Sequence, residues 1–160
     1  MNAVVLMMAA LMQVQDPAPA PSETLAVHKT WSGEDSRIDK AEYHRIAEPE
    51  AWTTLWQRHV GKKERAPEVD FEKHMIVAAF LGRVSWEKID VHAVKKTKDE
   101  IVFGLEVEDA DCCDFSTHPL FLIAVVPRSD LKLAIISRVR SGTDVDPRKD
   151  ELLKEFGKLE

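Results

Sequence analysis

The densest group of side chains that could do chemistry lies in one polar stretch, DADCCDFSTH at Asp109–His118. The side chains in it that could bind a metal are those of Asp109, Asp111, Cys112, Cys113, Asp114 and His118. Zinc sites space their cysteines by two to four residues so that both thiolates reach one ion, and here the cysteines are adjacent. Calcium loops alternate oxygen ligands around a glycine, a pattern that this stretch lacks. We interpret the stretch as a solvated acidic loop between strands, with a metal- or redox-sensitive site as the alternative.

The adjacent cysteines are the only two in the chain. A disulfide between sequence neighbours closes a strained ring, so a Cys112–Cys113 bond would be easily reduced and would not stabilise the fold. Cys113 and His118 could act as nucleophile and base, but the surrounding acids disfavour a thiolate. The six histidines are scattered, and the sequence contains neither a G-x-S-x-G motif nor a glycine-rich phosphate loop. The sequence therefore predicts no enzyme, no cofactor and no metal.

Most of the secondary structure that the sequence predicts, and that would position a functional site, consists of β-strands. Residues 75–81 and 119–126 are apolar on both alternating faces, which is typical of central strands covered on both sides. Residues 89–93 and 101–107 alternate between apolar and polar, and they predict a hairpin that turns at 96–99.

Further strands are predicted on either side of these four. Residues 25–31 resemble a short edge strand, and residues 38–47 resemble a strand that leads into a helix. Residues 131–139 are predicted to pair antiparallel with 119–126. We expect a free sheet edge at 25–31 or at 131–139, where a protein partner could dock by adding a strand.

One amphipathic helix is predicted at 49–60, PEAWTTLWQRHV. Its apolar face carries Trp52, Leu55, Trp56 and Val60. Pro49 suits the first turn of a helix, and Gly61 suits a left-handed stop. The predicted structural core includes Trp52, Trp56, Phe71 and Phe80, and core packing is favoured over a ligand-stacking role for the two tryptophans.

These elements predict an α+β fold, a mostly antiparallel, curled β-sheet with one principal amphipathic helix. Since one helix cannot cover both faces of two fully apolar strands, the sheet must curl into a half-barrel or a sandwich, or be covered by a partner. The predicted divisions are a signal peptide (1–15), a Pro/Ala-rich linker with a possible edge strand (16–30), an α+β domain (31–140), and a linker with a short C-terminal helix (141–160).

The composition and the N-terminal residues limit which partners and which cellular location we expect. The chain of 160 residues has 28 acidic against 22 basic side chains, a net charge of −6, which argues against a general nucleic-acid binder. The apolar run AVVLMMAALM at 3–12 has signal-peptide length and is too short to span a bilayer. We therefore expect an extracytoplasmic protein, periplasmic or secreted, without a transmembrane span.

The order of motifs from Tyr43 to Ser137 resembles the family of PrcB-like proteins, subunits associated with a secreted protease complex. The motifs that carry the resemblance are HRIAE, Trp52-x3-Trp56, Pro67-x-Val69-Asp70-Phe71, MIVAAFLG ending at Gly82, and PLFLIAVVP at 119–127. The resemblance implies a non-catalytic extracytoplasmic protein that binds or stabilises another protein, with a secreted protease as the expected partner. It adds a candidate function that the residues alone do not supply.

Overall fold

The computed structural model describes residues 21–108, 117–141, 144–145 and 150–159. The elements in chain order are β1 (Glu23–Thr24), β2 (Lys29–Gly33), β3 (Ala41–Ile46), α1 (Pro49–Val60), β4 (His74–Val84), β5 (Lys88–Lys96), β6 (Glu100–Glu108), β7 (His118–Pro127), β8 (Lys132–Ser141), β9 (Asp144–Val145) and β10 (Glu151–Phe156).

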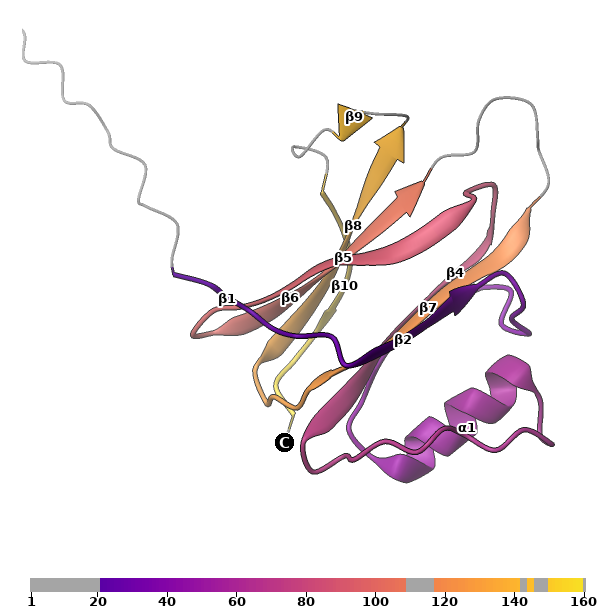
Figure 1. Ribbon diagram of the computed structural model, residues 1–160, viewed down its shortest axis with the longest axis horizontal. Helices are drawn as coiled ribbons and strands as arrows, with labels where there is room; N and C mark the ends of the chain where they lie inside the picture. The colour runs from indigo at the N-terminus through magenta and orange to yellow at the C-terminus, as the bar shows by residue number, and fades with distance from the viewer. Residues whose placement is uncertain (1–20, 109–116, 142–143, 146–149, 160) are drawn as a thin grey trace, which may run out of the picture.

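The strands form two sheets that pack face to face, with α1 on the outer face of one of them (Figure 1). One sheet has the order β2-β7-β4-β3. The other has the order β1-β5-β6-β8-β10, with β9 paired to β8. This arrangement confirms the predicted α+β class and the sandwich-like alternative, because two open sheets share one apolar interior.

The fully apolar strands β4 and β7 are the two inner strands of the four-stranded sheet, as predicted. One set of alternate β4 residues, which includes Met75 and Val77, faces the six-stranded sheet. The other set, which includes Ile76 and Phe80, packs toward α1. Both faces of these strands are therefore covered, one by a helix and one by a second sheet.

Helix α1 begins as the sequence predicts, with Glu48 in an extended N-cap conformation and Pro49 in the first turn. Gly61 ends it at φ 120°, and its N–H donates to Gln57 O at 3.0 Å. Trp52 is buried at 2% exposure and Phe80 at 0%, whereas Trp56 and Phe71 are half-buried at the border of the same cluster. The predicted core set is thus arranged around one interface, that of α1 with its sheet.

The strand predicted at 75–81 continues past Gly82 to Val84 through a shift in register. Gly82 has φ 74°, and a Cβ added there would lie 3.0 Å from Ala41 N. Glycine is required at this position because the positive φ and the close backbone approach both exclude a side chain.

The prediction that 131–139 pairs with 119–126 is wrong. Strand β8 lies in the other sheet, where it runs parallel to β6 and antiparallel to β10. The short turn after β7 therefore carries the chain from one sheet to the other. Adjacency in sequence suggested a hairpin, but Leu133 and Ile135 are fully buried between the sheets and hold β8 there.

The prediction of a C-terminal helix is also wrong, because residues 151–156 form strand β10 at the edge of β8. Leu152, Leu153 and Phe156 have helical spacing, but a register shift between Leu152 and Lys154 changes which of them faces the core. Leu153 and Phe156 then pack against the core between the sheets. A short helix is marginal on its own, so the unpaired edge of β8 and the apolar core override the local preference.

Strands β1 and β10 extend the folded unit beyond the predicted limits of 31–140. The edge strand predicted over 25–31 is two separate pieces, because β1 pairs with β5 while β2 pairs with β7 in the other sheet. The predicted signal peptide lies outside the described residues. In the part of the chain that is described, no helix has the length and apolarity that crossing a bilayer requires.

Candidate protein-docking edge

Most of the loop that the sequence singles out for chemistry lies outside the described residues. The residues that are not described include Asp111, Cys112, Cys113 and Asp114. Of its candidate ligands only His118 is described. It is the first residue of β7, and its Nε2 lies 3.9 Å from Glu34 Oε1. Groups of three or more metal-ligating side chains do not occur among the described residues. The metal- or redox-sensitive site in this loop stays a prediction.

Sequence reasoning missed the one histidine that the fold buries. His59 is 2% exposed, and its ring packs 4.2 Å from Phe121 and 5.6 Å from Phe80 between ring centroids. Its Nδ1 lies 3.0 Å from Ser36 Oγ. Burial lowers the pKa of His59 to about 4. The helical spacing could have revealed this burial, because His59 lies three residues after Trp56, about one turn of the helix. The spacing in the sequence instead placed Val60, the next residue, on the apolar face.

Three tryptophans hold α1 to its sheet. The Trp52 ring lies 5.8 Å from that of Trp31 and 5.1 Å from that of Trp56, and the third pair is 5.7 Å apart between centroids. Trp52 Nε1 donates to Pro67 O at 2.8 Å and so fixes the segment that follows the helix. Because Trp52 is 2% exposed and packs against two other indole rings, the core interpretation of this residue holds.

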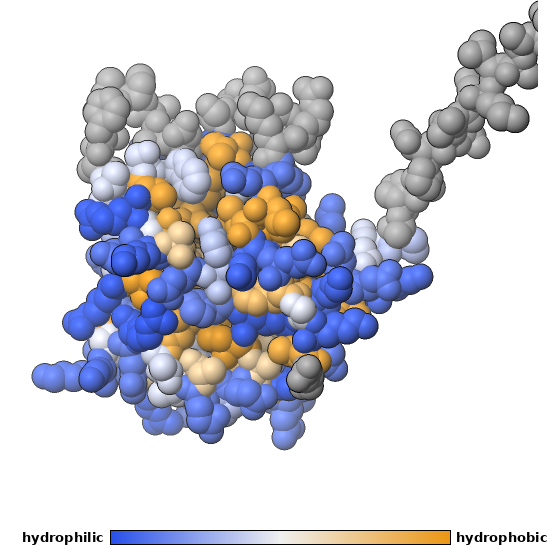
Figure 2. Space-filling view, turned by 180° about the vertical axis from the view of Figure 1, so that it is seen from behind, coloured by the Kyte–Doolittle hydropathy of each residue, from blue (hydrophilic) through white to orange (hydrophobic). Residues whose placement is uncertain are grey.

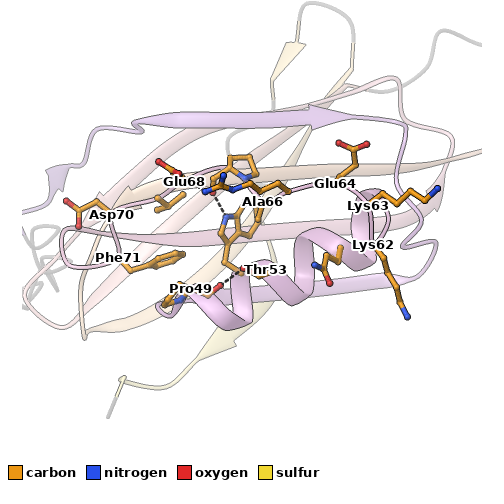
Figure 3. A pocket seen from close by; sticks show the side chains of 14 residues that line it. Pro49, Thr53, Lys62, Lys63, Glu64, Ala66, Glu68, Asp70 and Phe71 are labelled. Atoms are coloured by element: carbon orange, nitrogen blue, oxygen red, sulfur yellow. Dashed lines mark hydrogen bonds and ion pairs between the residues drawn. The ribbon is translucent and has the colours of Figure 1, made fainter.

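A groove of about 880 Å³ lies between α1 and the segment 61–71 (Figure 3). Apolar parts of Trp52, Pro67 and Phe71 line it, together with polar residues of the helix. Its charged side chains are exposed to solvent, and two of them, Arg65 and Glu68, form an ion pair at 2.9 Å. Catalytic pockets converge perturbed titratable groups on one point. Among the residues that line this groove, the pKa of Asp70 is lowered by its hydrogen bond with the exposed Lys73.

The second surface is an open sheet edge. Strand β1 covers β5 only at Lys95 and Lys96, and one further bond joins Leu25 N–H to Val94 O at 2.8 Å. The chain then crosses to the other sheet, where His28 N–H donates to Val125 O at 2.9 Å. The β5 backbone from Lys88 to Ala93 is therefore left without a strand on this side, within the residues described. We call this stretch the open edge.

Strand β2, the outer strand of the other sheet, lies next to the open edge. Its Cα atoms come within 8 Å of those of β5, yet the two strands belong to different sheets. Figure 1 shows β1, β2 and β5 on the side of the molecule that faces the viewer. A groove of about 470 Å³ lies between β5 and the crossing segment. Its apolar lining consists of Leu25, Val27, Val91, Ala93 and Val94.

The opposite side of the sandwich, where β3 and β10 are the outer strands, is tied together by side chains. Arg45 on β3 donates to Leu131 O at 2.7 Å and to Gly157 O at 3.0 Å, and it also contacts Ser129 O. Tyr43 packs against the core between the sheets. These contacts bridge the two sheets, whereas on the β2 and β5 side the groove remains accessible.

The predicted edge at 131–139 is not an edge, because β8 lies between β6 and β10. The predicted edge at 25–31 is confirmed only for residues 29–31, which belong to the outer strand β2, because residues 25–28 lie in no strand. Figure 2, the view from behind, shows apolar side chains in small groups among hydrophilic ones. Among the residues that the structure describes, the most exposed large apolar side chains are Val139, at 42%, and Leu152, at 58%.

Comparison of the chain with models of protein families, with curated proteins and with solved structures yields no match in any of the three.

Proposed function

We propose that this chain is a non-catalytic, extracytoplasmic protein-binding module that docks another protein through the open edge. The observation that carries the proposal is the imbalance along β5, a strand of nine residues whose outer neighbour β1 has two. Unpaired backbone groups at a sheet edge form a template for another strand. Proteins use such edges to capture extended segments of their partners.

The chemistry of the described surface supports binding over turnover. The charged side chains around the groove of Figure 3 are exposed to solvent, and the perturbed histidine, His59, is enclosed by aromatic rings. A general base must reach a substrate proton, directly or through one water. A buried imidazole whose Nδ1 faces Ser36 is better suited to packing than to that role.

The sequence supports the location and the kind of partner. The apolar run at 3–12 and the Pro/Ala-rich residues behind it fit an exported chain. The resemblance to PrcB-like proteins points to a protease outside the cytoplasm as the bound protein. On this proposal the chain stabilises or positions that protease, and it contributes no group to the protease's reaction.

The proposal predicts that the tagged chain, expressed in its host, is recovered outside the cytoplasm with a new N-terminus near Asp16–Pro21. It should co-purify in fixed stoichiometry with one protein, because an unpaired edge has room for one added strand. Fractionation, N-terminal mass spectrometry and quantitation of the co-purified protein measure both expectations.

The control for this capture is the same chain with Lys62→Glu, a change at the groove of Figure 3 and away from β5. This variant should recover the same protein in the same amount. Recovery of the uncleaved chain from the cytosol contradicts the export part of the proposal. Recovery of the exported chain without any stoichiometric protein contradicts the binding part.

A further inference from the structure

We propose that this chain forms a symmetric dimer through the outer face of its six-stranded sheet, so that the partner of this face is a second copy of the chain. The inference goes beyond the proposed function, because the face of the sheet is a different surface from the open edge. Three properties of the described residues support it: an apolar band across the face, rows of opposite charge on two neighbouring strands, and the area of the face.

An apolar band crosses the outer face from β5 to β10. Phe103 and Ile135 belong to the core between the sheets, so their neighbours Gly104 and Ile136 lie on the outer face. The strand register aligns one row there, Ala93, Gly104, Ile136 and Leu152, and places Val102 and Ala134 in the row beside it. Helix α1 packs on the other sheet, so no described helix covers this band (Figure 1). Its removal from water favours association.

The two central strands of this face carry opposite charges. Strands β6 and β8 run parallel and in register. On the outer face, the charged residues of β6 are all acidic and those of β8 are all basic. The pairs in register are Glu100 with Lys132, Glu106 with Arg138, and Glu108 with Arg140. Each copy therefore presents an acidic line beside a basic line, with the apolar band between the charged pairs.

This pattern is complementary to itself about one two-fold axis. An axis parallel to the strands, between β6 and β8, places β6 of each copy over β8 of the other. Glu100 and Glu106 then lie over the basic residues that are their register partners in the second copy, and the apolar band lies over itself. An axis across the strands places β6 over β6, and so acids over acids. The charges therefore select the first axis.

The flanking strands agree with this axis at all but one position. Lys95 on β5 lies over Glu155 on β10 of the second copy, because each is in register with the second row of the band. Asp90 lies over Asp150, which is a pair of like charges. Each of these aspartates already has a cation in its own copy, Lys88 at 2.5 Å from Asp90 and Arg138 at 3.9 Å from Asp150. The like pair is therefore partly neutralised.

The area of the face is sufficient for a weak dimer. Strands β5 and β6 have nine residues each, β8 has ten and β10 has six. With strands about 4.8 Å apart and about 3.3 Å per residue, the face covers on the order of 550 Å² per copy. Two copies bury about 1,100 Å² in total, just above the size of about 1,000 Å² that a specific interface requires.

Sedimentation of the full chain in the analytical ultracentrifuge tests the dimer. We expect a monomer–dimer equilibrium with a dissociation constant on the order of 10 μM. Glu100→Lys and Lys132→Glu each place two pairs of like charges across the axis, and each should weaken the dimer at least about tenfold. An equimolar mixture of the two variants restores opposite charges in both pairs. The mixture should therefore form a mixed dimer about as tight as that of the unchanged chain.

Ile136→Lys tests the apolar band. The side chain is half-buried on the outer face, and the substitution places two ammonium groups in the apolar contact of the dimer. It should weaken the dimer at least about tenfold. Circular dichroism checks that the monomer remains folded. Lys62→Glu, a charge change on the other side of the molecule, is the control and should associate as the unchanged chain does.

Self-association that none of the three variants changes overturns this inference, and it assigns the contact to another part of the chain, such as the apolar run at 3–12. A mixture of Glu100→Lys and Lys132→Glu that associates no better than either alone also overturns it, as does a chain that stays monomeric at on the order of 200 μM. If Ile136→Lys does not fold, the charge variants decide. A monomeric chain that still captures its stoichiometric protein keeps the proposed function and removes the dimer.

Discussion

Replacing Trp52 with alanine is expected to lower the free energy of unfolding by about 3–5 kcal/mol, the range for a large side chain removed from a core. The ring is 2% exposed and contacts the rings of Trp31 and Trp56. Its Nε1 also holds Pro67 O at 2.8 Å. The substitution therefore leaves a cavity under α1 and releases the segment after the helix.

Urea denaturation followed by tryptophan fluorescence and circular dichroism measures this loss. Thr53→Ala is the matched control, because Thr53 is the next residue of α1 and is exposed. Surface substitutions of that kind stay within about 0.5 kcal/mol. If Trp52→Ala costs as little as the control, the interface of α1 with its sheet is not what holds this side of the molecule together.

Acid is expected to destabilise the protein through His59. The pKa of His59 is about 4 in the folded chain, because its ring is buried, against an ordinary value of 6.5. Between these values the unfolded chain binds a proton that the folded chain does not. The contribution to stability is therefore complete above pH 6.5 and is lost as the pH falls toward 4. Each pKa unit corresponds to about 1.4 kcal/mol, so the loss is on the order of 3 kcal/mol.

Denaturant unfolding at a series of pH values measures this loss, and His59→Leu isolates it from other titrating groups. The ring of His59 faces Phe80, Phe121 and Trp56, and its polar neighbour is the hydroxyl of Ser36. Leucine keeps an apolar side chain at this position and does not titrate. The variant should lose less stability than the unchanged chain over this pH range. Parallel curves for the two proteins contradict the buried, neutral state of His59.

The sequence predicts those features that depend on the local pattern of apolar residues. The alternation in β5 and β6, the two-faced strands β4 and β7, and the amphipathic helix α1 each have a period that a short window reveals. The need for cover on both faces of β4 and β7 then predicts a sandwich-like curl. These elements were identified correctly because tertiary contacts and local preference agree there.

The failures come from contacts between residues far apart in sequence. Strand β10 has helical spacing, but the edge of β8 and the core beside Phe156 decide its state. Strand β8 follows β7 closely, yet it pairs with β6 and β10 in the other sheet. No short window contains that information. The open edge on β5 depends on where the chain crosses between sheets at Leu25–Lys29, and it was neither of the two edges predicted, 25–31 and 131–139.

The burial of His59 was missed for a different reason. Histidine is found both at surfaces and in cores, so its place on the helix had to be judged from spacing. Trp52, Leu55 and His59 are the buried residues of α1, while Val60 is half-buried. The predicted apolar face was therefore displaced by one residue at the end of the helix, so that Val60 was assigned to the core in place of His59.

Amide hydrogen exchange along β5, measured residue by residue in the free protein, tests the central claim most directly. The open edge predicts that every second amide from Lys88 to Ala93, those that point away from β6, exchanges rapidly. The amides of β7, which lies between β2 and β4, should exchange slowly throughout. If all β5 amides are as well protected as those of β7, the edge is covered and the docking account is contradicted.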